Sequence, residues 1–144
     1  MTEYKIFIDT NIWIYAFVEK NENKRKIILE FLEQLLKETT IVVSIQVINE
    51  FHYACFRKYK LKEDEIYRFV NDIKSIAQVS SLDFDIYEKA FKLRKRYNIS
   101  FWDSLIIAAA VENNCKILYS EDMQDKLKID NLIIKNPFNT YKGE

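Results

Sequence analysis

The sequence predicts an α/β fold in which a short parallel sheet of about four to five strands lies between two layers of helices. Runs of β-type residues alternate along the chain with longer stretches whose apolar residues recur at helical spacing. Hydrophobic residues make up 49% of the 144 residues, enough for the core of one domain. Strands that alternate with helices pair in parallel, with helices on both faces. We therefore expect residues 1–144 to form a single three-layer α/β/α domain.

The first half of the chain predicts two strands and two long helices. Tyr4–Ile8 is a strand-like run that ends at an acidic residue, and a short helical turn is expected from Asn11. Asn23–Lys37 is amphipathic and predicts a helix. Ile41–Val43 predicts a short buried strand, and Ser44–Tyr59 a helix with Ser44 as its N-cap.

The second half repeats the alternation. Ser100 is the predicted N-cap of the last helix, and the predicted strands are short. In chain order we expect a helix over Asp64–Ile76, a strand over Gln78–Ser80, helices over Asp83–Tyr97 and Ser100–Asn114, and strands over Lys116–Tyr119 and Leu132–Ile134.

The composition excludes several function classes. Lys and Arg number 22 and Asp and Glu number 22, so a generally basic nucleic-acid-binding coat is excluded, although a local basic patch is not. The only glycine is Gly143, so glycine-rich phosphate loops of kinases, GTPases and dinucleotide-binding enzymes are absent.

Histidine and cysteine usage excludes two further kinds of site. His52 is the sole histidine, and Cys55 and Cys115 form no C-x-x-C pair, which argues against structural zinc and against a histidine-dependent triad. We expect both thiols to be buried in a reducing cytoplasm. The longest apolar run, Leu105–Val111, is far shorter than the ~20 residues that cross a bilayer, so no membrane association is expected.

Acidic residues fall where a parallel sheet would gather them. Asp9 directly follows the first predicted strand, and Ser120-Glu121-Asp122 follows the strand over Lys116–Tyr119. Ligands of open parallel sheets bind beyond the carboxyl ends of the strands. Each acid alone is usually a helix cap or a solvated group, and it is the combination that favours a functional site.

Two more acids extend the set. Asp103 lies in the first turn of the helix that Ser100 caps, and Glu50 lies in the helix after the second strand, one turn beyond Gln46. No Lys or Arg stands directly beside Asp9 or Asp103. Clustered carboxylates repel one another, and hard divalent cations such as Mg²⁺ or Mn²⁺ relieve that repulsion.

The motifs that carry these acids resemble those of PIN-domain nucleases, and among them the VapC-type toxins of toxin–antitoxin pairs. The resemblance covers essentially the whole chain in the family's order and spacing. It rests on Ile8–Asn11, Gln46–Phe51, Phe101–Ala110 and Ile117–Gln124. The family's usual glycine after the last acidic segment is absent, because Lys126 follows Asp125.

This resemblance implies a metal-dependent endoribonuclease with a PIN-like fold. Asp9, Glu50, Asp103 and Asp122 would be the catalytic, metal-binding acids, and the metal would be Mg²⁺ or Mn²⁺. Whether Glu121 or Asp122 is the last ligand, and whether one or two ions bind, stays open. The supporting residues implied are Thr10 and Asn11, which would order the loop around Asp9, and Ser120, which would orient the last acid or a water molecule.

The resemblance also implies partners. An antitoxin would dock near Asn23–Lys37 and Ser44–Tyr59, and a homodimer is expected. Lys92, Arg94 and Lys95 belong to the densest basic stretch, which we interpret either as a track for RNA phosphates or as a solvated face that pairs with nearby acids, Asp85 and Glu88.

Rival functions remain. A non-catalytic PIN-like binding module should have lost acids from the site, whereas all four positions carry carboxylates. A PIN nuclease with a housekeeping role in RNA processing is a second alternative. A haloacid-dehalogenase-type phosphatase would need an Asp where Asn11 stands, and a phosphoacceptor receiver domain would need adjacent acids early in the chain.

Overall fold

A computed structural model describes residues 4–141 and folds them into one mixed sheet with helices on both faces. The strands are β1 (Tyr4–Ile8), β2 (Thr39–Ser44), β3 (Gln78–Ser80), β4 (Cys115–Tyr119), β5 (Lys128–Ile129) and β6 (Leu132–Lys135). The helices are α1 (Thr10–Phe17), α2 (Glu22–Glu38), α3 (Ile45–Arg57), α4 (Glu63–Ile76), α5 (Phe84–Arg96), α6 (Phe101–Glu112) and α7 (Pro137–Tyr141). The predicted α/β class is confirmed.

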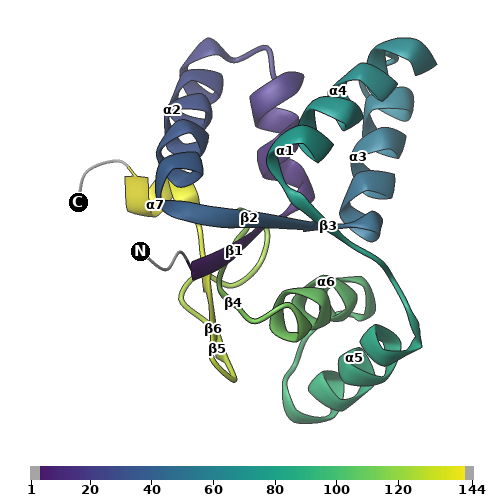
Figure 1. The fold of residues 1–144 in the computed structure, drawn as a ribbon, viewed down its shortest axis with the longest axis vertical. Helices are drawn as coiled ribbons and strands as arrows, with labels where there is room; N and C mark the ends of the chain where they lie inside the picture. Colours follow the sequence, from purple (N-terminus) through teal and green to yellow (C-terminus); the bar gives the residue numbers. More distant parts are fainter. Residues whose placement is uncertain (1–3, 142–144) are drawn as a thin grey trace.

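The helices form two layers around the sheet. Helices α1 to α4 and the short α7 lie on one side, and α5 and α6 pack together on the other (Figure 1). The predicted caps Ser44 and Ser100 start α3 and α6, where their hydroxyls accept the backbone N–H of Val47 and Asp103. The predicted three-layer arrangement is therefore confirmed.

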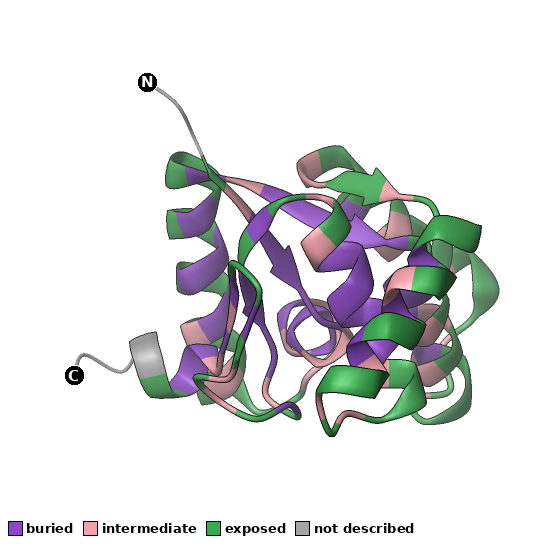
Figure 2. Ribbon diagram, turned by 90° about the horizontal axis from the view of Figure 1, so that it is seen from below, coloured by how far each residue is buried: buried purple, intermediate pink, exposed green. Residues whose placement is uncertain are grey.

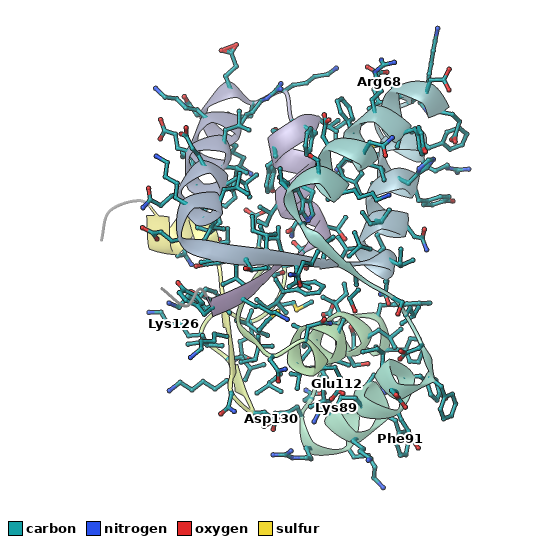
Figure 3. The ribbon with its side chains drawn as sticks, in the orientation of Figure 1. Arg68, Lys89, Phe91, Glu112, Lys126 and Asp130 are labelled. Atoms are coloured by element: carbon teal, nitrogen blue, oxygen red, sulfur yellow. The ribbon has the colours of Figure 1, made fainter. Side chains whose placement is uncertain are left out.

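The predicted number of strands was too low. The sheet has six strands in the order β3-β2-β1-β4-β6-β5, all parallel except for the antiparallel pair of β5 with β6. The missed strand, β5, is only two residues long, so it carries no alternation that a sequence pattern could reveal. Lys126 and Asp130 lie in the loops on either side of β5 (Figure 3). Both residues have a left-handed backbone, with φ of 69° and 53°.

The core lies on both sides of the central strands. Figure 2 shows the strands mainly buried and the outer helices exposed on their outward faces. Trp13, Phe7 and Phe51 are among the largest fully buried side chains. Cys55 and Cys115 are free and buried as predicted, and burial raises the pKa of their thiols to about 11 and about 12. No helix within residues 4–141 has the length and apolarity needed to cross a membrane.

Strand order places a crevice beside the predicted acids. β1 lies in the middle of the sheet, paired in parallel with β2 on one side and β4 on the other. The chain leaves β1 toward β2 and β3, then crosses back to β4, so the direction of strand order reverses between β1 and β4. Such a switch point opens a ligand-binding crevice at the carboxyl ends of the two strands. We call this end of the sheet the carboxyl edge.

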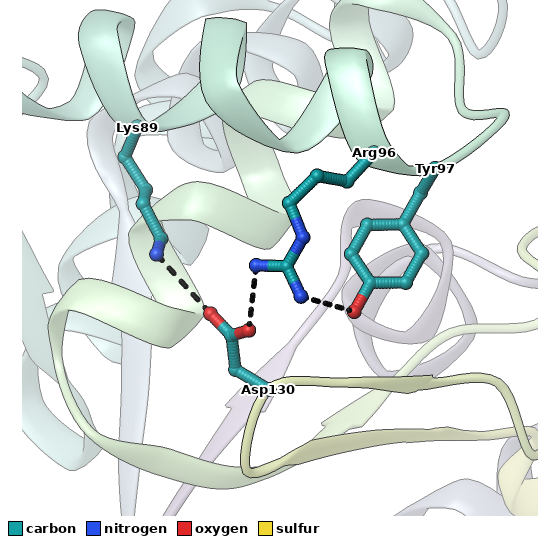
Figure 4. Close-up of polar contacts among 4 residues, drawn as sticks. All are labelled: Lys89, Arg96, Tyr97 and Asp130. Atoms are coloured by element: carbon teal, nitrogen blue, oxygen red, sulfur yellow. Dashed lines mark hydrogen bonds and ion pairs between the residues drawn. The ribbon is translucent and has the colours of Figure 1, made fainter.

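Helix α5 is fixed to the turn between β5 and β6. The Asp130 carboxylate accepts hydrogen bonds from Lys89 Nζ at 3.1 Å and from Arg96 Nη1 at 3.3 Å, and Arg96 also donates to the Tyr97 hydroxyl (Figure 4). Lys89 and Arg96 belong to the predicted basic stretch, and one interpretation paired that stretch with Asp85 and Glu88. Within residues 4–141 the ion pairs of Lys89 and Arg96 are instead formed with Asp130.

Candidate active site at the carboxyl edge

Asp9 is the centre of the candidate site. It follows β1 directly, caps α1 and is only 5% exposed. Its Oδ1 accepts the Thr10 backbone N–H at 2.7 Å, and its Oδ2 accepts the Ser120 hydroxyl at 2.8 Å. Burial raises the pKa of the Asp9 carboxyl to about 6; these two hydrogen bonds oppose the rise, and the charges of Glu50 and Asp103 add to it.

Glu50 is joined to Asp9 through Thr10. The Thr10 hydroxyl donates to Glu50 Oε1 at 2.9 Å, while its backbone N–H donates to Asp9. This bridge spans 40 residues of sequence and connects the start of α1 with the middle of α3. Two carboxylates are thus held beside one another by a single threonine, with each oxygen keeping a lone pair for another ligand.

Gln46 connects this pair to the third acid. Its Nε2 donates to Glu50 Oε2 at 3.1 Å and to the backbone carbonyl of Trp102 at 3.3 Å. The Trp102 carbonyl directly precedes Asp103, which is half-buried in the first turn of α6. Because α6 leads back into β4, its first turn lies at the carboxyl edge, near enough for the Asp103 charge to act on Asp9.

The loop after β4 is held by Ser120. Its Oγ donates to Asp9 and accepts the backbone N–H groups of Asp122 and Met123 at 3.2 and 3.3 Å. The serine is fully buried, whereas Asp122 is exposed, and within the described chain the Asp122 carboxylate forms no hydrogen bond or ion pair. Ser120 therefore orients the first acid, Asp9, and the backbone that carries Asp122.

Glu121 is engaged differently. It accepts a hydrogen bond from the Tyr15 hydroxyl, which in turn accepts one from Lys24 Nζ at 3.4 Å. Burial and the hydrogen bond to Glu121 raise the pKa of Tyr15. Sequence reasoning missed Tyr15 and Lys24. The available signal for Tyr15 was its position one turn after Asn11, which puts both on the same face of α1.

A cavity of about 510 Å³ opens on these residues. Its lining includes Asn11, Glu50, Glu121 and Asp122, so it brings acids from α3 and from the loop after β4 to one space. Both amide atoms of Asn11 are buried and lack a hydrogen-bond partner among the described residues. Unpaired buried amide groups are costly, and at this position they can bind a ligand or an ordered water in the cavity.

The donor set suits a hard divalent cation. The groups that converge are carboxylate oxygens, the ligands that Mg²⁺ and Mn²⁺ prefer, and within residues 4–141 Asp9 and Glu50 have no Lys or Arg ion-pair partner. As the described side chains stand, no three acidic, histidine or cysteine groups lie close enough together to hold an ion. The charges of Glu50 and Asp103 thus act on Asp9, but the described side chains do not form a complete set of metal ligands.

The predicted RNA-binding residues divide into two kinds. Lys92 and Lys95 are exposed on α5. Arg94 is half-buried instead: its Nη1 donates to the Ser104 hydroxyl at 2.8 Å, and its guanidinium carbon lies 4.8 Å from the centre of the Phe101 ring. Arg94 therefore fixes α5 against the first turn of α6, next to Asp103.

Residues 6–129 match the family model of the PIN domain. The chain belongs to the PIN domain family. No significant match was found among curated proteins.

The solved structures to which this PIN domain is similar include toxins of VapBC systems. The VapBC2 complex of Rickettsia felis, solved with a DNA fragment from its promoter, is 25% identical with a TM-score of 0.70 over 92% of this chain and 98% of that one. A toxin–antitoxin complex from Klebsiella pneumoniae is 22% identical, with a TM-score of 0.69 over 92% and 97% of the two chains. VapC20 of Mycobacterium tuberculosis, described as a toxin that cleaves the sarcin–ricin loop, is 16% identical, with a TM-score of 0.65 over 81% and 89%. The latter two likenesses concern the fold alone.

Proposed function

We propose that this PIN domain is a Mg²⁺- or Mn²⁺-dependent endoribonuclease that acts as the toxin of a toxin–antitoxin pair. One observation carries the proposal most directly: the buried Asp9 carboxylate and Glu50 are held together by Thr10 at the switch point of the sheet, with no ion-pair partner in the described chain. A stable protein keeps such an arrangement when a ligand relieves the repulsion.

Each residue has a distinct task in this proposal. Asp9, Glu50, Asp103 and Asp122 would hold the ion, which supplies Lewis-acid activation of water and offsets charge on the scissile phosphate. With a pKa of about 6, Asp9 is mostly ionised at neutral pH and so is available as a ligand. The Ser120 hydroxyl, which donates a hydrogen bond to Asp9 Oδ2, keeps that oxygen in place.

Two partners follow from the same proposal. The Rickettsia and Klebsiella neighbours were solved as complexes of toxin with antitoxin, which supports an antitoxin as the partner of this chain. We also propose a homodimer. The exposed large apolar side chains on α2 and α3, the helices where docking is predicted, are Leu29, Leu36, Ile45, Tyr53 and Phe56. Action in the cytoplasm is consistent with the two free cysteines.

Cleavage of a mixed RNA population by the purified protein tests the activity. We expect cleavage in Mg²⁺ or Mn²⁺ and none in chelator, and we expect Asp9→Asn and Asp103→Asn each to abolish it while leaving the circular-dichroism spectrum unchanged. Near-normal cleavage by either variant would refute the assignment of the site.

A matched pair tests the loop after β4. Asp122→Asn should reduce cleavage far more than Glu121→Gln, because Glu121 is engaged by Tyr15 whereas the Asp122 carboxylate has no described partner. The reverse ranking would make Glu121 the ligand. Absence of cleavage with either metal, from folded protein free of antitoxin, would favour a non-catalytic PIN-like module instead.

A further inference from the structure

A second hollow lies beside the candidate active site and is aromatic rather than acidic. This groove has a volume of about 650 Å³, within the range of small-ligand pockets. Four of its lining residues come from one face of α3, one from the loop before α5 and one from the start of α6: Gln46, Asn49, Glu50, Tyr53, Leu82 and Trp102. We call it the Trp102 groove.

The groove is continuous with the acids. Glu50 lines both this groove and the acidic cavity, and Trp102 is the residue directly before Asp103. The Gln46 amide fixes this proximity, since it binds the Glu50 carboxylate and the Trp102 carbonyl together. A ligand part that rests on Trp102 therefore lies next to the carboxylates proposed to cleave RNA.

The walls and floor of the groove differ in chemistry. Tyr53 and Trp102 are each 63% exposed, although aromatic side chains of this size usually bury most of their surface. The floor is polar: Gln46 is only 6% exposed, and its Oε1 accepts no hydrogen bond from any residue the structure describes. An apolar helix would leave these polar groups unpaired, whereas a nucleobase offers both a stacking face and hydrogen-bonding edges.

A cation lies beside one aromatic wall of the groove, and a second cation lies on the ring that supports the other wall. The Arg57 guanidinium carbon lies 5.9 Å from the centre of the Tyr53 ring. On the other side the Phe101 ring packs edge-on against Trp102, at 4.9 Å between ring centres, and carries the Arg94 guanidinium. Aromatic faces for bases with adjacent cations for phosphates are the two components of single-strand recognition. Arg57 thus supplies a cation beside the Tyr53 face, whereas Arg94 is already bound to Ser104 and supports the Phe101–Trp102 pair.

We propose that the Trp102 groove binds an unpaired base of the RNA strand by stacking on Trp102, and so positions the neighbouring phosphate at the carboxylates. The inference rests on the proposed function for the identity of the polymer. It assigns Trp102 and Tyr53 as substrate-positioning residues.

Binding in chelator tests this without cleavage. The probe is a mixed-sequence single-stranded RNA of about 12 nucleotides, within the site size of single-strand-binding proteins, with the same sequence in duplex form as comparison. Stacking should quench Trp102 fluorescence with the single strand and much less with the duplex. Trp13, the other tryptophan, is fully buried, so Trp102→Phe should lose the quench.

Variants measure the contribution of stacking. Trp102→Leu should weaken binding of the single strand by about 5- to 100-fold, and Trp102→Phe should retain most of the affinity because it keeps an aromatic face. Tyr67→Leu is the matched control, since Tyr67 is 64% exposed but lies on α4 and does not line the groove. We expect it to bind as the wild type does.

Three results would overturn the proposal. The first is that Trp102→Leu binds the single strand with wild-type affinity, and the second is that the duplex quenches Trp102 fluorescence as strongly as the single strand does. The third is that, without RNA, quenching of Trp102 by acrylamide decreases as the protein concentration rises. The last would show that a second copy covers the groove. Different results refute the proposed nuclease activity and the proposed stacking site. Trp102-dependent binding without any cleavage in Mn²⁺ refutes the nuclease, and cleavage by Trp102→Leu at the wild-type rate and affinity refutes the stacking site.

Discussion

The raised pKa of Asp9 predicts an unusual dependence of stability on pH. The unfolded chain releases this proton near pH 3.8, whereas the folded protein keeps it until about pH 6. Between these values the folded state binds more protons than the unfolded state, so the free energy of unfolding must fall as pH rises. The contribution of Asp9 is therefore fully present below pH 3.8 and lost above about pH 6.

The size of the effect follows from the same two values. A difference from 3.8 to about 6, at about 1.36 kcal/mol per pH unit, corresponds to about 3 kcal/mol. Because Asp9 is almost fully buried, solvent screening reduces this figure little. Other groups titrate in the same range, so the prediction concerns the difference between the wild type and Asp9→Asn.

Urea denaturation of metal-free protein, followed by circular dichroism across this range of pH in chelator, measures that difference. The free energy of unfolding of the wild type should decline relative to Asp9→Asn by about 3 kcal/mol from the acidic to the neutral end. Asp125→Asn is the control of opposite sign, because the backbone N–H of Asn136 lowers the pKa of Asp125. At neutral pH, Mn²⁺ at a hundredfold excess over its Kd should stabilise the wild type by about 2.7 kcal/mol, and Asp9→Asn much less.

Parallel pH profiles for the wild type and Asp9→Asn would refute the reasoning, since they would mean that Asp9 ionises in the folded protein as it does in the unfolded chain. An unchanged unfolding transition in Mn²⁺ would refute the metal site independently of the pH result.

Three further predictions concern the scaffold. Lys126→Gly should raise the free energy of unfolding by about 1 kcal/mol, because the left-handed backbone at this position favours glycine. The control Lys128→Gly, in β5, should lower the free energy of unfolding, and equal effects of the two variants in urea denaturation would contradict this. Tyr15→Phe removes the hydrogen bond to Glu121 and should cost about 1.5 kcal/mol, and a thermal midpoint equal to that of the wild type would argue against that bond in solution. Asn tolerates the left-handed backbone of Asp130, but Asp130→Asn loses the ion pairs with Lys89 and Arg96 and should lower the free energy of unfolding by less than about 1 kcal/mol. Because salt screens exposed charges, the loss should be smaller in 1 M salt, and an equal loss there would contradict the ion pairs.

Periodicity and capping residues were sufficient to predict most elements of the fold. Helix α2 buries Ile28, Phe31, Leu32 and Leu35 at helical spacing, which is the pattern visible in the sequence. By contrast, β5 has two residues and α7 five, and both form through contacts with β6 and α2 rather than through their own composition. Such elements depend on tertiary contacts and leave no local signal.

The positions of the candidate acids relative to the sheet could be predicted from the sequence, but their contacts could not. Asp9 and Asp122 were found because each follows a predicted strand of a parallel sheet, a rule that needs only element order. The Thr10 bridge to Glu50 and the Tyr15 contact to Glu121 depend on how α1 packs against α3 and against the loop after β4. The orientation of Trp102 likewise depends on the packing of α6, so the groove could not be inferred beforehand.

The central place of β1 also determines when the site can exist during synthesis. Its first neighbour, β2, is complete at Ser44, but its second, β4, ends only at Tyr119, and the serine that holds Asp9 is the next residue. At about 5–20 residues per second, a ribosome needs several seconds to make the intervening segment. Throughout that interval β4 and Ser120 have not been made, so β1 lacks its second neighbour and Asp9 lacks the serine that holds it. If the chain is the ribonuclease proposed above, its site forms only after Ser120 has been made, whereas α2 and α3, the helices where antitoxin docking is predicted, are made earlier.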